Sequence, residues 1–321
     1  MKKKLLFKKV FLLFCFNGLV FLIIQLFSDG VLINIRTALF SQKLPDKFYS
    51  TYHARDGLRQ FGFIQTRLRY QDQTLNKEIL REKIQATSSL DSSKEIALSF
   101  SKNGEDGGCG EKSDNLIENI LWISQGHGHG CCSDHAQAFL AYSIYNGLTV
   151  REVNNLAHTF NEFYDYKYQK WVWIDPEFCL LARSRNGEYL SSLDILDFYA
   201  HHKPFDYIFF GNINHILFHK PIFPTYDGLG GLEPFGAIII TNGNNVFEVN
   251  YWNAKLTILP RSVRQFLLIS CGIQPGYLLY NPNRSIWEKL LFIKGLILIF
   301  LVLLIYSNIR LWRFMTKKFN S

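Results

Sequence analysis

The chain has 321 residues, of which 48% are hydrophobic and 19% charged, so it is too apolar for a disordered protein and long enough to bury a core. Its formal net charge of +8 would suit binding to nucleic acid or to an anionic surface. The excess positive charge, however, lies at the two ends. Residues 1–29 and 288–321 hold 11 of the 35 Lys and Arg residues and 2 of the 27 acids, which leaves 24 bases against 25 acids between them. This distribution argues against a nucleic-acid partner.

Both ends of the chain are also its most apolar parts. Residues 10–28 follow a lysine-rich start and have the length of a helix that crosses a hydrocarbon core of about 30 Å. A cleaved signal peptide is the alternative, but the run is long and no small-x-small cleavage site follows it. The apolar run at residues 290–306 is interrupted only by Lys294 and is flanked by Trp287 and Trp312, which predicts a second membrane span at residues 289–309.

The bases that flank these two runs predict, by the positive-inside rule, that both termini lie in the cytoplasm and that the region between them faces outward. The expected order is N-terminus, span, extracytoplasmic domain, span and tail: residues 1–9, 10–28, 30–287, 289–309 and 310–321. Within the outer domain, the core is expected at about 90–180 and a strand-rich part at 181–287. A composition rich in Lys, Asn and Phe is typical of AT-rich bacterial genomes, which favours the bacterial inner membrane.

The six cysteines fit this compartment. One lies in the first predicted span and five lie outside, where disulfides are allowed. Because five is odd, at least one outer thiol is expected to be unpaired within the chain. The six are Cys15, Cys109, Cys131, Cys132, Cys179 and Cys271.

The outer domain begins with a segment of no clear period, residues 30–73. Apolar residues at helical spacing then predict helices over residues 74–85, 92–102, 114–124, 132–146 and 191–202. Ser92 and Glu95 have the spacing of a capping box, and Gly147 is placed to end the fourth of these helices. Alternating aromatic-rich stretches predict strands over residues 148–153, 158–164 and 171–174, and a strand-rich part over residues 237–260 around a turn at 242–244.

Three residues with the chemistry of a thiol nucleophile follow one another in this pattern. Cys132 begins a predicted helix, where unpaired backbone N–H groups stabilise a thiolate. His158 begins the next long strand and can hold the thiol proton. Asp175 ends the following strand and can orient the imidazole by accepting its other N–H. A hairpin between the two strands would bring His158 and Asp175 together.

Four short segments around these residues resemble the motifs of the transglutaminase-like superfamily, G-x-C-x-D-x-A, G-[IL]-x-x-R, H-x-W-x-E-[VF] and W-x-x-[ILV]-D-P. The matching segments are GCCSDHA at residues 130–136, NGLTVR at 146–151, HTFNEF at 158–163 and WVWIDP at 171–176. The motifs are short, but their order and approximate spacing agree over residues 90–180. One departure is Phe160, which stands where the family usually has Trp.

The resemblance implies an α+β fold with a papain-like core, in which a helix carrying Cys132 packs on antiparallel strands carrying His158 and Asp175. It implies a cysteine protease, amidase or transamidase that cleaves or transfers the acyl group of an amide in a protein, peptide or cell-wall component. The backbone N–H of Cys132 is the expected oxyanion donor, and Gln125 and Gly130 are further candidates for oxyanion or substrate binding. No cofactor or metal is expected, since no calcium-site pattern is visible.

Three alternatives compete with this interpretation. Cys131 is adjacent to Cys132, although the Gly-x-Cys and Cys-x-Asp spacings select Cys132. A glycine-rich loop holds His127, His129 and Cys131, whose imidazole and thiolate groups suit zinc or copper. Third, the protein could keep the fold as an inactive scaffold or binding module of the cell envelope, because members of this family have lost activity.

Overall fold

The computed structural model describes residues 8, 10–18, 20, 29–43, 88–100, 132–155, 158–211, 238–241, 246–259, 261–274, 276–280 and 285–318. The chain divides into two units, Met1–Phe40 with Ser285–Ser321, and Ser41–Arg284. The described elements of the first unit are helices, and those of the second form an α+β structure. The helices predicted over residues 74–85 and 114–124 lie outside the described residues.

The longest element of the first unit is α13 (Ser285–Lys318). Its residues Glu288–Arg313 are long and apolar enough to cross a membrane, and this is the one such helix found in the described part of the chain. The predicted span at residues 289–309 therefore lies within a longer helix. The predicted first span is described over only part of its length, where residues 10–18 are helical.

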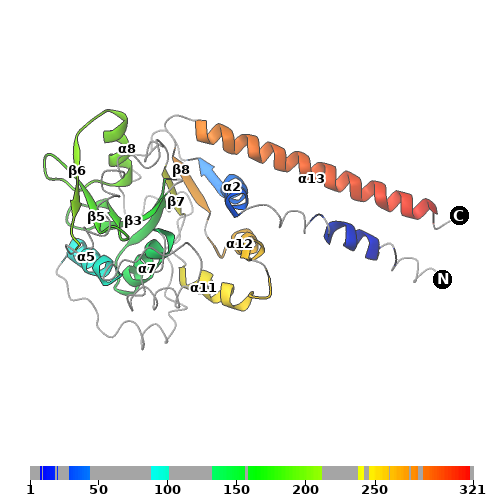
Figure 1. The fold of residues 1–321 in the computed structure, drawn as a ribbon, viewed down its shortest axis with the longest axis horizontal. Coiled ribbons are helices and arrows are strands. Elements are labelled where there is room, and N and C mark those ends of the chain that lie inside the picture. The colour runs from blue at the N-terminus through cyan, green and yellow to red at the C-terminus, as the bar shows by residue number, and fades with distance from the viewer. Residues whose placement is uncertain are drawn as a thin grey trace. The chain divides into compact units, whose positions relative to one another are not determined.

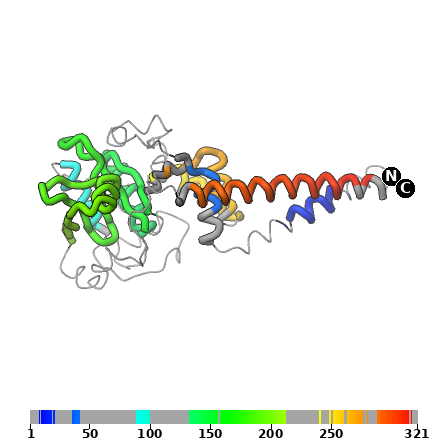
Figure 2. The backbone as a smooth tube through the Cα atoms, turned by 90° about the horizontal axis from the view of Figure 1, so that it is seen from above, coloured from blue at the N-terminus to red at the C-terminus, as the bar shows by residue number. Residues whose placement is uncertain are grey.

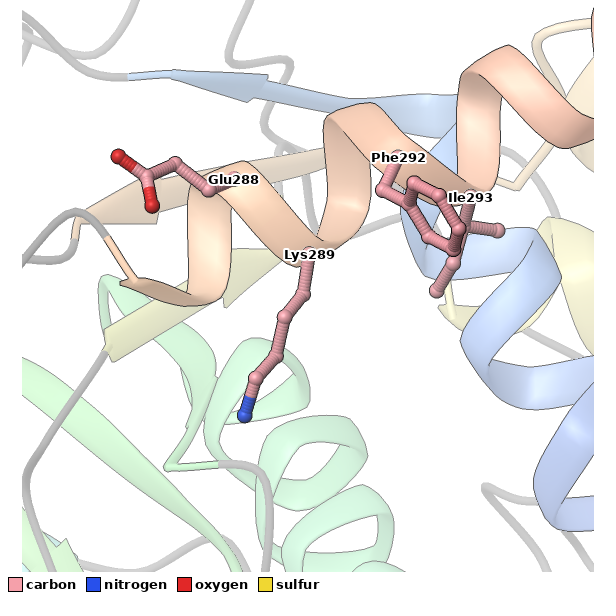
Figure 3. Close-up of a pocket in the computed structure, with 4 residues that line it drawn as sticks. All are labelled: Glu288, Lys289, Phe292 and Ile293. Atoms are coloured by element: carbon pink, nitrogen blue, oxygen red, sulfur yellow. The ribbon is translucent and has the colours of Figure 1, made fainter.

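The apolar surface of α13 begins within its first two turns. Glu288 and Lys289 lie one turn before Phe292 and Ile293, and these four side chains line a shallow hollow (Figure 3). From Phe292 onward the exposed side chains are mostly large and apolar. This change from charged to apolar residues marks the position, near the start of α13, where a hydrocarbon layer would begin.

An amide pair joins the two ends of the chain within this unit. Residues 10–18 lie beside the C-terminal half of α13 (Figures 1 and 2). Asn17 Nδ2 donates to Asn308 Oδ1 at 2.9 Å, and Asn308 Nδ2 donates to Asn17 Oδ1 at 3.3 Å. The unit also contains α2 (Asp29–Phe40), which falls where the sequence shows no clear period.

The second unit is built on one eight-stranded sheet of order β1-β8-β7-β2-β3-β4-β5-β6. Neighbouring strands are antiparallel except β1 and β8, which are parallel. The strands are β1 (Ser41–Lys43), β2 (Val150–Asn154), β3 (Thr159–Asp165), β4 (Lys170–Asp175), β5 (Leu180–Ser184), β6 (Phe205–Phe209), β7 (Ile238–Thr241) and β8 (Tyr277–Tyr280). The predicted hairpin of β3 and β4 is confirmed.

Helices pack on this sheet and complete two hydrophobic clusters, because successive side chains of a strand point to opposite faces. Phe163 of β3 belongs to the cluster that contains Ile96 and Phe139 of two helices, α5 and α7. Trp173 of β4 belongs to the other cluster, with Leu193 of α8. Figure 1 shows these helices around the sheet. The helices of this unit are α5 (Ser89–Phe100), α7 (Cys132–Tyr145), α8 (Ser192–Ala200), α11 (Val246–Lys255) and α12 (Arg261–Ser270).

A buried ion pair crosses the centre of the sheet. Arg151 of β2 lies opposite Glu162 of β3, and Arg151 Nε donates to Glu162 Oε2 at 2.6 Å. Both side chains are completely buried. The guanidinium lies 3.9 Å from the ring centroid of Trp171, and the backbone N–H of Ser192 donates to Glu162 Oε1 at 2.6 Å. Glu162 therefore links β2 and β3 to the start of α8.

The helix α7 ends as its sequence predicts. Gly147 has φ +79°, a conformation that glycine adopts without steric cost. Its N–H donates to Ile144 O at 3.0 Å, and Leu148 N–H donates to Ser143 O at 2.9 Å. These two bonds form a Schellman motif, which satisfies the last carbonyl groups and turns the chain into β2.

The predicted start of α5 is wrong by one turn. The helix begins at Ser89, and Ser88 Oγ accepts the Asp91 N–H at 3.1 Å. Ser88 and Asp91 have the same three-residue spacing as the predicted pair Ser92 and Glu95, so the pattern fits two positions. Ser92 is buried inside the helix instead, because it faces the core.

The strand-rich interpretation of residues 237–260 is correct only for its first part, β7. Val246–Lys255 forms α11, although its alternating apolar and polar residues are typical of a strand. Glu248 in the first turn and Lys255 in the last turn match the helix dipole. The helix also packs against α7 and α12, and such tertiary contacts can override local preference.

Candidate active site

Cys132 is the first residue of α7 and is partly exposed. A helix N-terminus carries backbone N–H groups without intrahelical partners and about half a positive charge. In proteins generally, these two features favour the thiolate form of a cysteine at the start of a helix. Cys132 is a free thiol, as is Cys271 in the same Ser41–Arg284 unit.

His158 immediately precedes β3 and is held at its backbone by Asn155. Asn155 Oδ1 accepts the His158 N–H at 2.8 Å, and the Asn155 N–H donates to the His158 carbonyl at 3.1 Å. These two bonds fix the point where the chain enters the strand. The imidazole is nearly buried, with 9% of its side chain exposed.

Asp175 ends β4 and uses both carboxylate oxygens. Its Oδ2 lies 2.7 Å from His158 Nε2. Its Oδ1 accepts the backbone N–H groups of Glu177 at 3.0 Å and of Phe178 at 3.2 Å, which closes the turn between β4 and β5. The Phe178 ring stacks on the imidazole at a centroid distance of 5.5 Å. Asp175 and the turn that it closes therefore fix the ring of His158.

The second ring nitrogen of His158 remains for the thiol. On this side of the ring, Glu177 Oε2 lies 3.8 Å from His158 Nδ1. The ligand atoms of Cys132, His158 and Glu177 all lie within 4.8 Å of one another. The structure thus brings together the three predicted residues Cys132, His158 and Asp175, and adds Glu177.

The electrostatics of this cluster favour a charged imidazole. Burial alone would lower the pKa of His158. The Asp175 carboxylate, its hydrogen bond, the hydrogen bond with Cys132 and the charge of Glu177 outweigh burial and raise the pKa of His158 well above 6.5. An imidazolium beside a cysteine at a helix N-terminus is the arrangement that stabilises a thiolate–imidazolium pair.

The same atoms bear on metal binding. Cys132, His158 and Glu177 form a cluster of donors that a zinc ion could accept. A metal would compete with proton transfer, because a metal-bound thiolate and imidazole cannot exchange a proton. The metal loop considered from the sequence, with His127, His129 and Cys131, lies outside the described residues.

Two sequence candidates remain untested, and two residues of the observed site were not among the candidates. Gln125 and Gly130 lie outside the described residues, so their role in oxyanion or substrate binding stays a prediction. Sequence reasoning missed Glu177 and Phe178, although both follow Asp175-Pro176 directly. The available signal was the turn after β4. Residues that directly follow a strand fold back and can lie beside a site residue at the end of that strand.

Comparison with protein-family models, curated proteins and solved structures gives no match for this chain.

Proposed function

We propose that the protein is a membrane-anchored, transglutaminase-like cysteine enzyme that cleaves or transfers acyl groups of amides. The observation that carries this proposal is the position of His158 between two partners, with Asp175 Oδ2 at 2.7 Å from Nε2 and the Cys132 sulfur within 4.8 Å of a ring nitrogen. A papain-like core would have the same parts, a cysteine at the start of a helix that packs on antiparallel strands. The substrate class is an amide of a protein, peptide or cell-wall component.

The reaction follows from these positions. His158 Nδ1 takes the Cys132 proton, and the sulfur attacks the carbonyl carbon of the amide to give a tetrahedral intermediate. The backbone N–H of Cys132, at the start of α7, donates to the oxyanion. His158 then returns the proton to the nitrogen of the leaving amine as the C–N bond breaks, which leaves a thioester on Cys132. Water or a second amine attacks the thioester and releases the acyl group.

The pH dependence of Cys132 alkylation tests this proposal without a known substrate. We expect iodoacetamide to modify Cys132 of the full chain in neutral detergent with a midpoint well below the ordinary thiol pKa of about 8.5. In His158→Ala, the midpoint should move to about 8.5 because the thiolate loses its imidazolium partner. Fragment-ion mass spectrometry separates Cys132 from the neighbouring cysteine.

The matched control is His201→Ala, since His201 is an exposed histidine at the end of α8. It should leave the midpoint unchanged. A midpoint near 8.5 in the unaltered protein, or an equal midpoint in His158→Ala, would contradict the proposal and favour an inactive scaffold. Zinc that copurifies with the protein and blocks Cys132 would favour a metal site.

We also propose that the chain crosses the membrane twice, with both termini on one side. The candidate span in α13 and the paired amides of Asn17 and Asn308 support this arrangement. An amide that lacks a partner in hydrocarbon costs free energy, so two such side chains at the same depth favour helix pairing. A topology with both ends in the cytoplasm agrees with the basic residues near each terminus.

Cysteine cross-linking tests the pairing. In a Cys15→Ser background, Asn17→Cys with Asn308→Cys should form an intrachain disulfide in membranes, because these side chains are in contact. Phe14→Cys with Asn308→Cys is the control, since Phe14 is 74% exposed on the same helical segment. Equal cross-linking of both pairs would contradict the proposed helix pairing.

A further inference from the structure

The turn between β4 and β5 delivers a second carboxylate to the candidate active site. Glu177 Oε2 lies 3.8 Å from His158 Nδ1, whereas Asp175 is bound to the opposite ring nitrogen, Nε2. The Glu177 side chain is 15% exposed, while Asp175 is fully buried. Glu177 is therefore the carboxylate that an incoming molecule can approach.

The formal charges of the four groups in the candidate active site do not cancel. With the thiol ionised and the imidazole protonated, Cys132, Asp175 and Glu177 each carry a negative charge and His158 carries one positive charge. The four groups therefore sum to two negative charges. The N-terminus of α7 offsets only about half of one charge. A binding site with this balance attracts cations and repels anions.

We propose that Glu177 is a specificity-determining residue that selects amide substrates with a positively charged group, an ammonium or guanidinium, next to the scissile bond. This inference rests on the proposed function, because it concerns the substrate that Cys132 attacks. A carboxylate beside the nucleophile stabilises a bound cation in the Michaelis complex and in the transition state. The same charge disfavours substrates with a carboxylate at that position.

The backbone of the turn allows Glu177 to be replaced without loss of the contacts made by Asp175. Asp175 Oδ1 accepts the N–H of residue 177, and this bond does not depend on the side chain there. Glu177→Gln keeps the shape of the side chain and removes only its charge. Glu188→Gln is the matched control, because Glu188 is an exposed residue of the turn that follows β5.

Charged thiol reagents of similar size measure the selection directly. We expect a trimethylammonioethyl methanethiosulfonate to modify Cys132 of the full chain faster than the anionic sulfonatoethyl reagent, relative to their rates with a free thiol in solution. Glu177→Gln should reduce this cation preference by about tenfold, the effect of exchanging opposite charges about 6 Å from a carboxylate in water. The difference should shrink in 1 M salt, which screens the charge.

The outcomes separate this inference from the proposed function. Glu188→Gln should leave the preference unchanged, and Glu177→Lys should reverse it towards the anionic reagent. An unchanged preference in both Glu177 variants would overturn the inference, even where His158→Ala still shifts the alkylation midpoint. A Cys132 thiol that is not activated by His158 would instead overturn the proposed function.

Discussion

Asp175→Asn is expected to slow alkylation of Cys132 at pH 6 by about 100-fold, because a thiol with a pKa of about 8.5 is only about 0.3% ionised at that pH. The variant keeps Oδ1, which caps the turn, and places an amide N–H donor where Oδ2 accepts from His158 Nε2. The neutral imidazole would then carry its proton on Nδ1, facing the thiol, and could no longer take the thiol proton. The measurement is the rate of iodoacetamide modification at pH 6.

The chain provides a matched control at the end of the neighbouring strand. Asp165 ends β3, and its Oδ1 accepts the N–H groups of Lys167 at 2.8 Å and Tyr168 at 3.3 Å. Asp165→Asn therefore alters the same kind of turn cap far along the hairpin from His158. Equal alkylation rates for Asp175→Asn and Asp165→Asn would show that Asp175 only shapes its turn.

Asp175→Asn should also change how the stability of the protein depends on pH. The pKa of His158 is raised well above 6.5 in the folded protein, so the folded state binds this proton more tightly than the unfolded chain. The resulting stabilisation is complete below about pH 6.5 and is lost as the pH rises through the folded-state pKa. Asp175→Asn removes the main cause of the raised pKa of His158. In this variant the melting temperature should therefore fall less steeply as the pH rises.

Glu162→Gln should lower the free energy of unfolding by about 3–5 kcal/mol, since it leaves a buried guanidinium without its counter-charge. Arg151 and Glu162 are completely buried, and Glu162 also accepts the N–H of Ser192 at 2.6 Å. For a domain of this size the melting temperature should fall by about 10 °C. Differential scanning fluorimetry of the full chain in neutral detergent measures this change.

Two further variants test the cause of that loss. Glu188→Gln changes an exposed acid and should alter stability by no more than about 0.5 kcal/mol. The double variant Arg151→Met with Glu162→Leu removes both charges and should be more stable than Glu162→Gln alone. A double variant as unstable as the single one would show that packing, not the unpaired charge, causes the loss.

Local signals predict the part of the fold that holds the candidate site. The strands β3 and β4 and the helix α7 were predictable, because aromatic alternation and Gly147 act within a few residues. Because the turn between β3 and β4 is short, the sequence also predicts that His158 and Asp175 lie close together. Asn155 and Glu177 were not predictable in the same way, because their effect depends on how two turns fold back on the imidazole.

The errors in the sequence prediction have a common physical origin. The pair Ser88 and Asp91 and the pair Ser92 and Glu95 offer the same capping pattern, and only burial of Ser92 in the core decides between them. In Val246–Lys255 the apolar residues satisfy both periods, and packing on neighbouring helices selects the helix. In both cases long-range contacts determine which of two local structures of similar free energy forms.

The parallel pairing of β1 with β8 has a consequence for how such a domain can be accommodated in a longer chain. These are the first and last strands of the Ser41–Arg284 unit, and Ser41 lies beside Tyr277. The points where the chain enters and leaves the sheet are therefore about 10 Å apart, the length of a few strand residues. A unit whose ends lie this close can be inserted between two helices of another unit without interrupting their packing. In chain order, the sheet-forming unit Ser41–Arg284 is inserted between the two segments of the helical unit, Met1–Phe40 and Ser285–Ser321.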